Sequence, residues 1–136
     1  MIKRIYGVNI AVKNLDEAVA RYESAIGVKA EPLREADFAF PGLIGAKLNV
    51  NGVYLTLIAS KTNNTAVSSF LERKGEGVFL VSLEVDSIEN DSISLKERGL
   101  VLLLDQPARG EFGAVNFVHP KSMHGVQLEI IQPNVA

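Results

Sequence analysis

The first half of the chain recurs in its second half, and this repeat constrains the fold more than any other feature. Matching residues lie 73 positions apart at both ends of the repeat: Val12 and Val85, Gly52 and Gly125, and Leu55 and Leu128. Each copy has the pattern of a strand, a helix and further strands, so we predict an α+β fold of two tandem βαβββ modules. We expect one domain over residues 1–136, with repeats at 1–60 and 75–133 joined by a short helical linker at 65–74.

The start of the first copy predicts a strand followed by a capped helix. Residues 8–12 alternate between apolar and small or polar side chains, which is the period of a half-buried strand. Asn14 is expected to cap a helix, with Glu17 in the capping-box position and Gly27 as the left-handed residue that ends it. One face of this helix is apolar: Leu15, Ala18, Val19, Tyr22 and Ile26.

The rest of the first copy predicts a hairpin after an irregular connection. Residues 31–42 show no regular period, whereas 46–50 and 53–58 have the pattern of strands. Asn51 and Gly52 between them form one of the strongest two-residue hairpin signals. A linker helix should follow, with three apolar residues packed inward: Val67, Phe70 and Leu71.

The second copy repeats this order. Residues 78–85 alternate as a strand, and Asp86 or Ser87 is expected to cap a helix that ends at Gly99. One face of that helix carries Ile88, Ser92 and Leu95. Three further strand candidates complete the copy: the apolar run 100–104 and a hairpin pair at 114–118 and 125–131.

The predicted strands have one aliphatic face and one mixed face. The mixed face carries small, apolar and uncharged polar side chains with two carboxylates: Gly7, Asn9, Ala11, Tyr54, Thr56, Ile58, Leu80, Ser82, Glu84, Gln127, Glu129 and Ile131. Such a mixture is typical of a concave small-molecule site. A half-exposed sheet covered by a dimer partner explains the same pattern.

Composition excludes several classes of function. The chain has no cysteine, so thiol catalysis, disulfides and cysteine-based metal centres are excluded. A net charge of −2 gives no strong field toward nucleic acid or an anionic membrane. The longest apolar runs are too short to span a bilayer, and the first residues lack a signal-peptide core, so we expect a cytoplasmic protein.

Four stretches resemble a known family. They are IAVKNLDEA at 10–18, FLERKGEG at 70–77, FVHPKS at 117–122 and GVQLE at 125–129. Together with the repeat, they resemble the vicinal oxygen chelate superfamily, which includes glyoxalase I, extradiol dioxygenases, bleomycin resistance proteins and methylmalonyl-CoA epimerase. The epimerase branch is the most similar. The resemblance implies a glyoxalase-like fold, in which the two modules form an open cup-shaped barrel, and it implies a homodimer.

The resemblance also implies a divalent metal, held by one His, Glu or Gln from the first and last strand of each module. The positions that carry over are Gly7, Thr56, Leu80 and Glu129. Only Glu129 keeps a strong donor, and catalytic transition-metal sites normally use three or more protein ligands. We therefore predict that no metal binds in the cup and that the protein uses no cofactor.

Two carboxylates are the catalytic candidates. An enclosed Glu129 or Glu84 would lose hydration, which raises its pKa and makes it a usable general acid or base. The alternative for Glu84 is an exposed position at the rim. The alternative for Glu129 is a structural hydrogen bond to Asn9, Thr56 or Gln127.

The remaining candidates are residues expected to contact a ligand. The connection 36–44 is unusually apolar, which favours an apolar or aromatic ligand, or side chains that fill the space of the lost metal. His119 and His124 could share a metal, but 119–122 has the character of a turn, and Lys121 could meet an anion or stay solvated. The predicted ligand-binding residues are Asn9, Tyr54, Thr56, Leu80, Ser82, Gln127, Phe38, Phe40, His119 and Lys121.

These observations favour a metal-independent protein that binds a small apolar or acyl-CoA-like molecule in the cup between the repeats, as bleomycin resistance proteins bind their ligand. The alternative is an isomerase or lyase, of the methylmalonyl-CoA epimerase or lactoylglutathione lyase type. In that case Glu129 transfers a proton next to a carbonyl. A third reading is a subunit with a plugged cup whose role is association.

Overall fold

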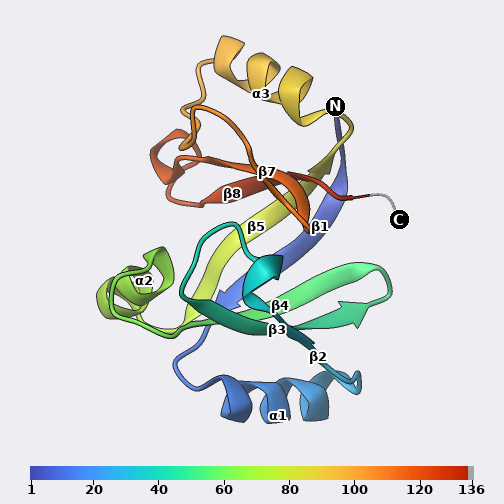
Figure 1. Cartoon of the computed structure of the whole chain (residues 1–136), viewed down its shortest axis with the longest axis vertical. Coiled ribbons are helices and arrows are strands. Elements are labelled where there is room, and N and C mark those ends of the chain that lie inside the picture. The colour runs from blue at the N-terminus through green and yellow to red at the C-terminus, as the bar shows by residue number, and fades with distance from the viewer. Residues whose placement is uncertain (135–136) are drawn as a thin grey trace. The chain divides into compact units, whose positions relative to one another are not determined.

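A computed structural model describes residues 1–134 as eight strands with three α-helices and two short 3-10 turns (Figure 1). The elements in chain order are β1 (Ile2–Ala11), α1 (Leu15–Ile26), β2 (Glu31–Leu33), η1 (Glu35–Asp37), β3 (Leu43–Val50), β4 (Val53–Ser60), α2 (Ala66–Lys74), β5 (Gly77–Val85), α3 (Ile88–Glu97), β6 (Ala108–Gly110), β7 (Gly113–Val118), η2 (Pro120–Ser122) and β8 (Leu128–Gln132). A strand, a helix and three strands occur twice, with α2 between them. The predicted α+β fold of two βαβββ modules is confirmed.

The strands and helices divide into two units, with one boundary inside β1 and the other inside β5. The first unit is Gly7–Phe79, and the second unit joins Met1–Tyr6 to the chain from Leu80 onward. Linker helix α2 belongs to the first unit, and the first half of β1 belongs to the second. Among the described residues, no helix is long and apolar enough to cross a membrane.

In the first unit, the strands lie in the order β2-β3-β4-β1. Strands β3 and β4 are antiparallel, whereas β1 and β4 are parallel. Asn51 and Gly52 connect β3 to β4 with positive φ angles of 53° and 96°, as the predicted two-residue hairpin requires. Residues 31–42 are more regular than expected, because β2 pairs with β3 and η1 follows it.

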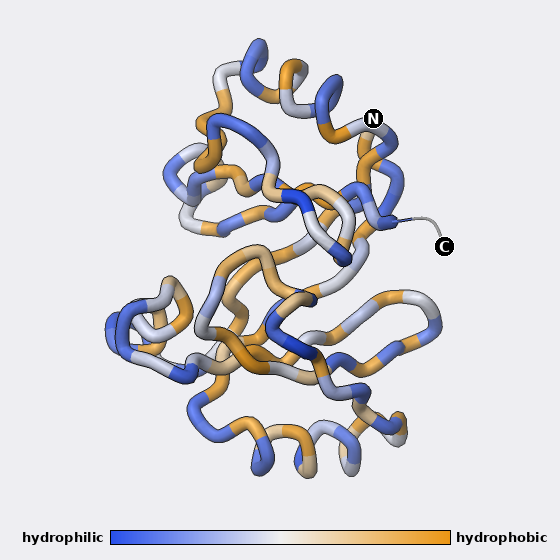
Figure 2. Tube along the Cα trace, viewed as in Figure 1, coloured by the Kyte–Doolittle hydropathy of each residue, from blue (hydrophilic) through white to orange (hydrophobic). Residues whose placement is uncertain are grey.

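Helix α1 covers one face of these strands (Figure 1). Asn14 Oδ1 accepts a hydrogen bond of 3.0 Å from Glu17 N, and Gly27 ends the helix at φ 79°, as predicted. Hydrophobic and hydrophilic residues alternate along the helix (Figure 2). Its apolar residues pack on a strand core as follows: Leu15, Ala18, Val19 and Tyr22 against Val12, Leu48, Leu57 and Ala59. Ile26, predicted for the same face, is instead 40% exposed at the end of the helix.

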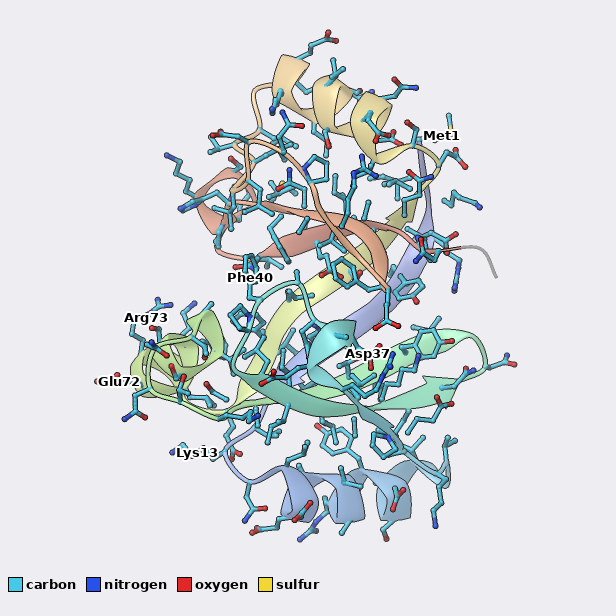
Figure 3. The ribbon with its side chains drawn as sticks, viewed as in Figure 1. Met1, Lys13, Asp37, Phe40, Glu72 and Arg73 are labelled. Atoms are coloured by element: carbon cyan, nitrogen blue, oxygen red, sulfur yellow. The ribbon has the colours of Figure 1, made fainter. Side chains whose placement is uncertain are left out.

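Linker helix α2 packs on one end of the opposite face of the first unit. Thr65 caps α2 through a 3.0 Å bond from Ser68 N, which supports the predicted linker helix. The core at this end contains Ala11, Leu43, Ile58 and Val67, with Phe38, Phe70, Leu71 and Phe79 packed against it. Glu72 and Arg73 point away from this core into solvent (Figure 3).

In the second unit, the strands lie in the order β5-β8-β7-β6. Strand β8 is parallel to β5 and antiparallel to β7. Ser87, one of the two predicted caps, accepts a 3.2 Å hydrogen bond from Asn90 N at the start of α3. The helix packs through Ile88 and Leu95 onto a core with Val85, Ala114 and Ile130.

Two strand predictions in the second unit are wrong in extent. The run 100–104 forms a single bridge from Leu102 to Val118 instead of a strand. The side chain of Asn116 bonds to both backbone groups of Leu104 at 3.1 and 3.0 Å, so a side chain replaces the next rung of the ladder. The final strand also starts three residues later than predicted, at Leu128, because η2 and a turn with His124 at φ 54° precede it.

Candidate functional site

The mixed face of the first unit consists of three rows across β1, β4 and β3. Cross-strand partners define them: Ala11, Ile58 and Gly45; Asn9, Thr56 and Lys47; and Gly7, Tyr54 and Asn49. Phe38 covers the first row, since a Cβ added to Gly45 would lie 2.9 Å from Phe38 Cζ. The second row is polar and half-buried. A buried apolar row, packed under Phe38, therefore adjoins the half-buried polar row.

Lys47 was not among the predicted site residues, yet it lies on this face. Its Nζ sits 4.6 Å from the centre of the Tyr54 ring. The alternation of β3 contained the signal, because residues 43, 45, 47 and 49 share the face of Thr56 and Tyr54. The sequence interpretation applied alternation only to the first and last strands of each module, and so it missed the lysine.

At Gly7 the structure leaves no room for a metal-binding side chain. A Cβ at this residue would overlap the backbone carbonyl oxygen of Tyr54 on the neighbouring strand. A histidine or carboxylate there would require β1 and β4 to move apart. Glycine is therefore demanded by the close approach of the two strands.

Glu129 and Ser82 are cross-strand partners on the mixed face of the second unit. Ser82 is 2% exposed, and its hydroxyl donates a 2.6 Å hydrogen bond to Glu129 Oε1. Glu129 keeps some exposure as a residue, but its carboxyl group is enclosed. Burial raises the pKa of Glu129 to about 7, against the smaller opposing effect of the Ser82 hydrogen bond. Phe117 is the cross-strand partner of Glu129 on β7.

Glu84, the second predicted catalytic residue, is engaged in ion pairs. Lys3 Nζ lies 3.4 Å from Glu84 Oε2, and Arg4 Nε lies 3.0 Å from Glu84 Oε1. Both cations come from the first half of β1. These partners favour a structural role for Glu84 and leave Glu129 as the better candidate for proton transfer.

The other predicted ligand-binding residues of the second unit lie on β5 and around η2. Leu80 is buried at 3% exposure, and the Gln127 carbonyl accepts a 3.1 Å bond from Val81 N. His119 caps η2, where its Nδ1 accepts a 3.0 Å bond from Lys121 N. This hydrogen bond gives His119 the turn-building role that the sequence analysis offered as an alternative. The Lys121 side chain is exposed.

Phe40, from the apolar connection of the first unit, is 44% exposed, whereas Phe38 two residues earlier packs into the core (Figure 3 labels Phe40). The two aromatic residues therefore differ in role. Phe38 fills space over the strands, and Phe40 presents an apolar ring at the surface.

The residues at the family's metal-ligand positions do not fit a metal ion. Two of the four are Gly7 and Leu80, which have no donor atom, and a third is Thr56, whose hydroxyl is a poor ligand. Within residues 1–134, no three His, Asp or Glu side chains gather into a group that could hold a metal. Glu129 alone retains a carboxylate, and it is bonded to Ser82.

The known proteins that are similar to this chain include several methylmalonyl-CoA epimerases. Over 136 residues the chain is 30% identical to the ethylmalonyl-CoA/methylmalonyl-CoA epimerase of Cereibacter sphaeroides, covering 97% of this chain and 99% of that protein. It is 28% identical over 132 residues to the mitochondrial methylmalonyl-CoA epimerase of Bos taurus, covering 95% and 74%. A solved variant of the Streptomyces coelicolor methylmalonyl-CoA epimerase, in complex with 2-nitronate-propionyl-CoA, superposes with a TM-score of 0.89 at 28% identity, covering 99% and 100%.

The family model for these folds matches most of the chain. Its match runs over residues 7–118, from the strand that carries Gly7 to the end of β7. It therefore includes the first module, the linker helix and most of the second module. With this match, the chain belongs to the Glyoxalase/Bleomycin resistance protein/Dioxygenase superfamily.

Proposed function

We propose that the protein binds an acyl-CoA thioester and needs no metal ion to do so. Its relatives include epimerases of acyl-CoA substrates, and one similar structure contains an acyl-CoA analogue. On the mixed face of the first unit, the half-buried polar row of Asn9, Thr56 and Lys47 lies beside a buried apolar core, and a few polar groups in apolar surroundings suit the carbonyl of a thioester.

The metal-independent part of this proposal rests on the residues that stand at the family's metal-ligand positions. Gly7 has no donor atom, and the Tyr54 carbonyl leaves no room for one at that position. A ligand held by a metal would lose affinity when the metal is removed, whereas a ligand held by side chains would not.

Calorimetry with acetyl-CoA, propionyl-CoA and malonyl-CoA tests the proposal. We expect at least one thioester to bind. Its Kd should be the same in 5 mM EDTA as in buffer that contains Zn²⁺, Co²⁺ or Ni²⁺ at about the protein concentration. CoA without an acyl group serves as the control. Failure of every thioester to bind, or binding that disappears with chelator, contradicts the proposal.

A second candidate function is proton transfer next to a carbonyl, with Glu129 of the second unit as the base. A carboxyl group with a pKa of about 7 is half ionised at neutral pH and can both take and return a proton. The Glu129 carboxylate removes the proton from the carbon beside the carbonyl, and the C–H electron pair moves into an enolate. Return of a proton from the carboxyl group to that carbon completes an isomerase-type exchange.

Exchange of the substrate proton with deuterated solvent measures this step directly. We expect slow incorporation of deuterium beside the carbonyl by the wild-type protein and a loss of at least about 100-fold in Glu129→Gln. Glu84→Gln is the matched control, because Glu84 is a strand carboxylate held by Lys3 and Arg4. Equal exchange by wild type and Glu129→Gln contradicts the catalytic role and leaves the binding function.

The homodimer implied by the family resemblance also stays a proposal. Sedimentation equilibrium should give twice the 14.7 kDa chain mass at micromolar concentration. A mass of one chain under those conditions contradicts it.

A further inference from the structure

The two repeats build a turn of the same backbone shape from different residues. In the first unit, Asn51 and Gly52 have φ angles of 53° and 96°. In the second unit, 73 positions later, His124 and Gly125 have φ angles of 54° and 92°. Histidine, like asparagine, adopts the left-handed conformation more readily than most residues. The backbone shape of this turn therefore does not require asparagine at position 51.

Asparagine followed by glycine is the residue pair in which spontaneous deamidation is fastest, because no side chain hinders the approach of the glycine nitrogen to the asparagine Cγ. The chain has nine asparagines, and Asn51 is the only one that glycine follows. Asn51 is exposed at the tip of the β3-β4 hairpin, directly beyond the last strand pair, Val50 and Val53. Position 51 thus combines a reactive pair with access to water.

A second asparagine holds the reactive nitrogen. Gly52 N donates a 2.7 Å hydrogen bond to Oδ1 of Asn49, at the end of β3. Cyclisation requires this nitrogen to lose its proton and to approach the Asn51 Cγ, so the hydrogen bond must break first. In the second repeat, the equivalent Gly125 N donates instead to the backbone carbonyl of Pro120, at 2.9 Å. A side chain therefore restrains the nitrogen in the turn that carries the reactive pair.

We propose that Asn51 is a modification site that deamidates spontaneously, and that the Gly52–Asn49 hydrogen bond limits the rate. This inference is independent of acyl-CoA binding. The electron pair of the Gly52 nitrogen forms a bond to Asn51 Cγ, and the side-chain nitrogen leaves as ammonia with the proton that Gly52 has lost. Water then adds to one carbonyl of the resulting succinimide ring and breaks its bond to the ring nitrogen, which gives aspartate or isoaspartate.

The isoaspartate product does not fit a two-residue turn. It places one extra carbon atom in the main chain between Val50 and Val53, and the length of a hairpin loop sets the register of the strands that it joins. The next pair along the hairpin is Asn49 and Tyr54, so the change reaches the mixed face of the first unit. We therefore expect the modified protein to have a looser hairpin end and an added negative charge.

Peptide mapping after incubation in water enriched in the heavy oxygen isotope tests the site. The heavy isotope enters the product only if the ring opens during the incubation, which excludes deamidation during digestion. We expect labelled aspartate and isoaspartate at position 51 of the wild-type protein. Asn49→Ala should react about 10-fold faster, the factor expected for the loss of one hydrogen bond. Wild type unfolded in urea should also react faster than folded wild type.

Two variants provide matched controls. Asn51→His places the residue of the second repeat in the first, so it should keep the turn and give no labelled product at position 51. Asn14→Ala likewise removes an asparagine Oδ1 that accepts from a backbone N–H, but at α1, and should leave the rate at Asn51 unchanged. Circular dichroism and melting curves establish that each variant is folded, and Asn49→Leu replaces Asn49→Ala if the latter is not.

Each result bears on one part of the inference. Absence of labelled product from both wild type and Asn49→Ala contradicts the modification site. Equal rates in these two proteins, or an equal acceleration in Asn14→Ala, contradict the role of the Asn49 hydrogen bond. Prolonged incubation should lower the Tm of wild type but not that of Asn51→His. An unchanged Tm after conversion to isoaspartate contradicts the expected effect on the hairpin.

Discussion

Glu129 differs from the other acidic side chains whose pKa is displaced. The pKa of Asp37 is lowered by the Arg34 backbone hydrogen bond, and that of Glu89 by hydrogen bonds at the start of α3 and from Arg109. Burial acts in the opposite direction on Glu129, and the single hydrogen bond from Ser82 does not offset it. The carboxyl group is therefore held in a setting that favours its neutral form.

The stability of the protein should report this directly. Well below pH 4.5, Glu129 is protonated in both the folded and the unfolded chain. Between pH 4.5 and about 7 the folded chain keeps a proton that the unfolded chain has released, so the free energy of unfolding falls as pH rises through this window. The rise in pKa corresponds to a loss of about 3 kcal/mol, which is complete once the pH is well above the folded-state pKa.

Urea denaturation of wild type and Glu129→Gln at pH 5 and pH 8 measures the loss. The glutamine side chain of the variant is neutral at both pH values, so we expect similar stabilities at pH 5 and a more stable variant at pH 8. The other titrating groups are common to both proteins and cancel in the difference. A stability difference that does not change with pH contradicts the raised pKa.

Sequence reasoning named Glu129 as a candidate but not Lys47, for an identifiable reason. Glu129 follows from strand alternation in β8 together with the family resemblance. Lys47 lies on a middle strand, and its place on the mixed face depends on the cross-strand register, which puts it beside Thr56 and over Tyr54. Register between strands is a long-range property that a single sequence does not fix.

At the level of elements, the sequence predicted the helix caps and the hairpin turn correctly. It did not predict the conformation of the apolar run 100–104. The caps at Asn14 and Ser87 and the Asn51-Gly52 turn depend on residues within three or four positions, and all three are confirmed. The run 100–104 is apolar enough for a strand, but Val101 and Leu103 are 41% and 44% exposed. Its conformation is decided by a polar side chain of β7, Asn116.

Asn116 should be important for stability although it is not a candidate for the proposed chemistry. It is 1% exposed, and its Oδ1 also accepts a 2.7 Å bond from Phe117 N. Asn116→Ala should lower the free energy of unfolding by about 3 kcal/mol, because it removes these bonds and leaves Leu104 backbone groups unsatisfied. The Leu104 amide should also lose protection from hydrogen exchange.

Asn14→Ala provides the comparison for that measurement. It removes an exposed helix cap and should cost about 1 kcal/mol without changing exchange at Leu104. Equal effects of the two substitutions on stability and exchange contradict the role assigned to Asn116.

For the whole molecule, the repeat at an offset of 73 residues was sufficient to predict the order of elements. It did not predict where the compact units divide. Repeated sequence records which segments are equivalent, whereas the units depend on which segments pack together. The first five residues of β1 show the difference, since they lie in the first repeat yet belong to the second unit.

Removal of metal ions should not change the thermal stability of the protein. Because Gly7, Thr56 and Leu80 replace three ligands, we expect the same Tm in EDTA as in untreated protein. Addition of Zn²⁺, Co²⁺ or Ni²⁺ at 100 µM should raise the Tm no more in wild type than in Glu129→Gln. A site of micromolar affinity would instead add about 2.7 kcal/mol at this concentration, which is visible as a shift of several degrees.

The passage of β1 from one unit into the other means that this chain cannot be halved by a single cut. A fragment that starts at Leu80 leaves behind Lys3 and Arg4, so Glu84 keeps its negative charge with both counter-charges gone. A fragment that stops at Phe79 retains six leading residues that belong to the other half.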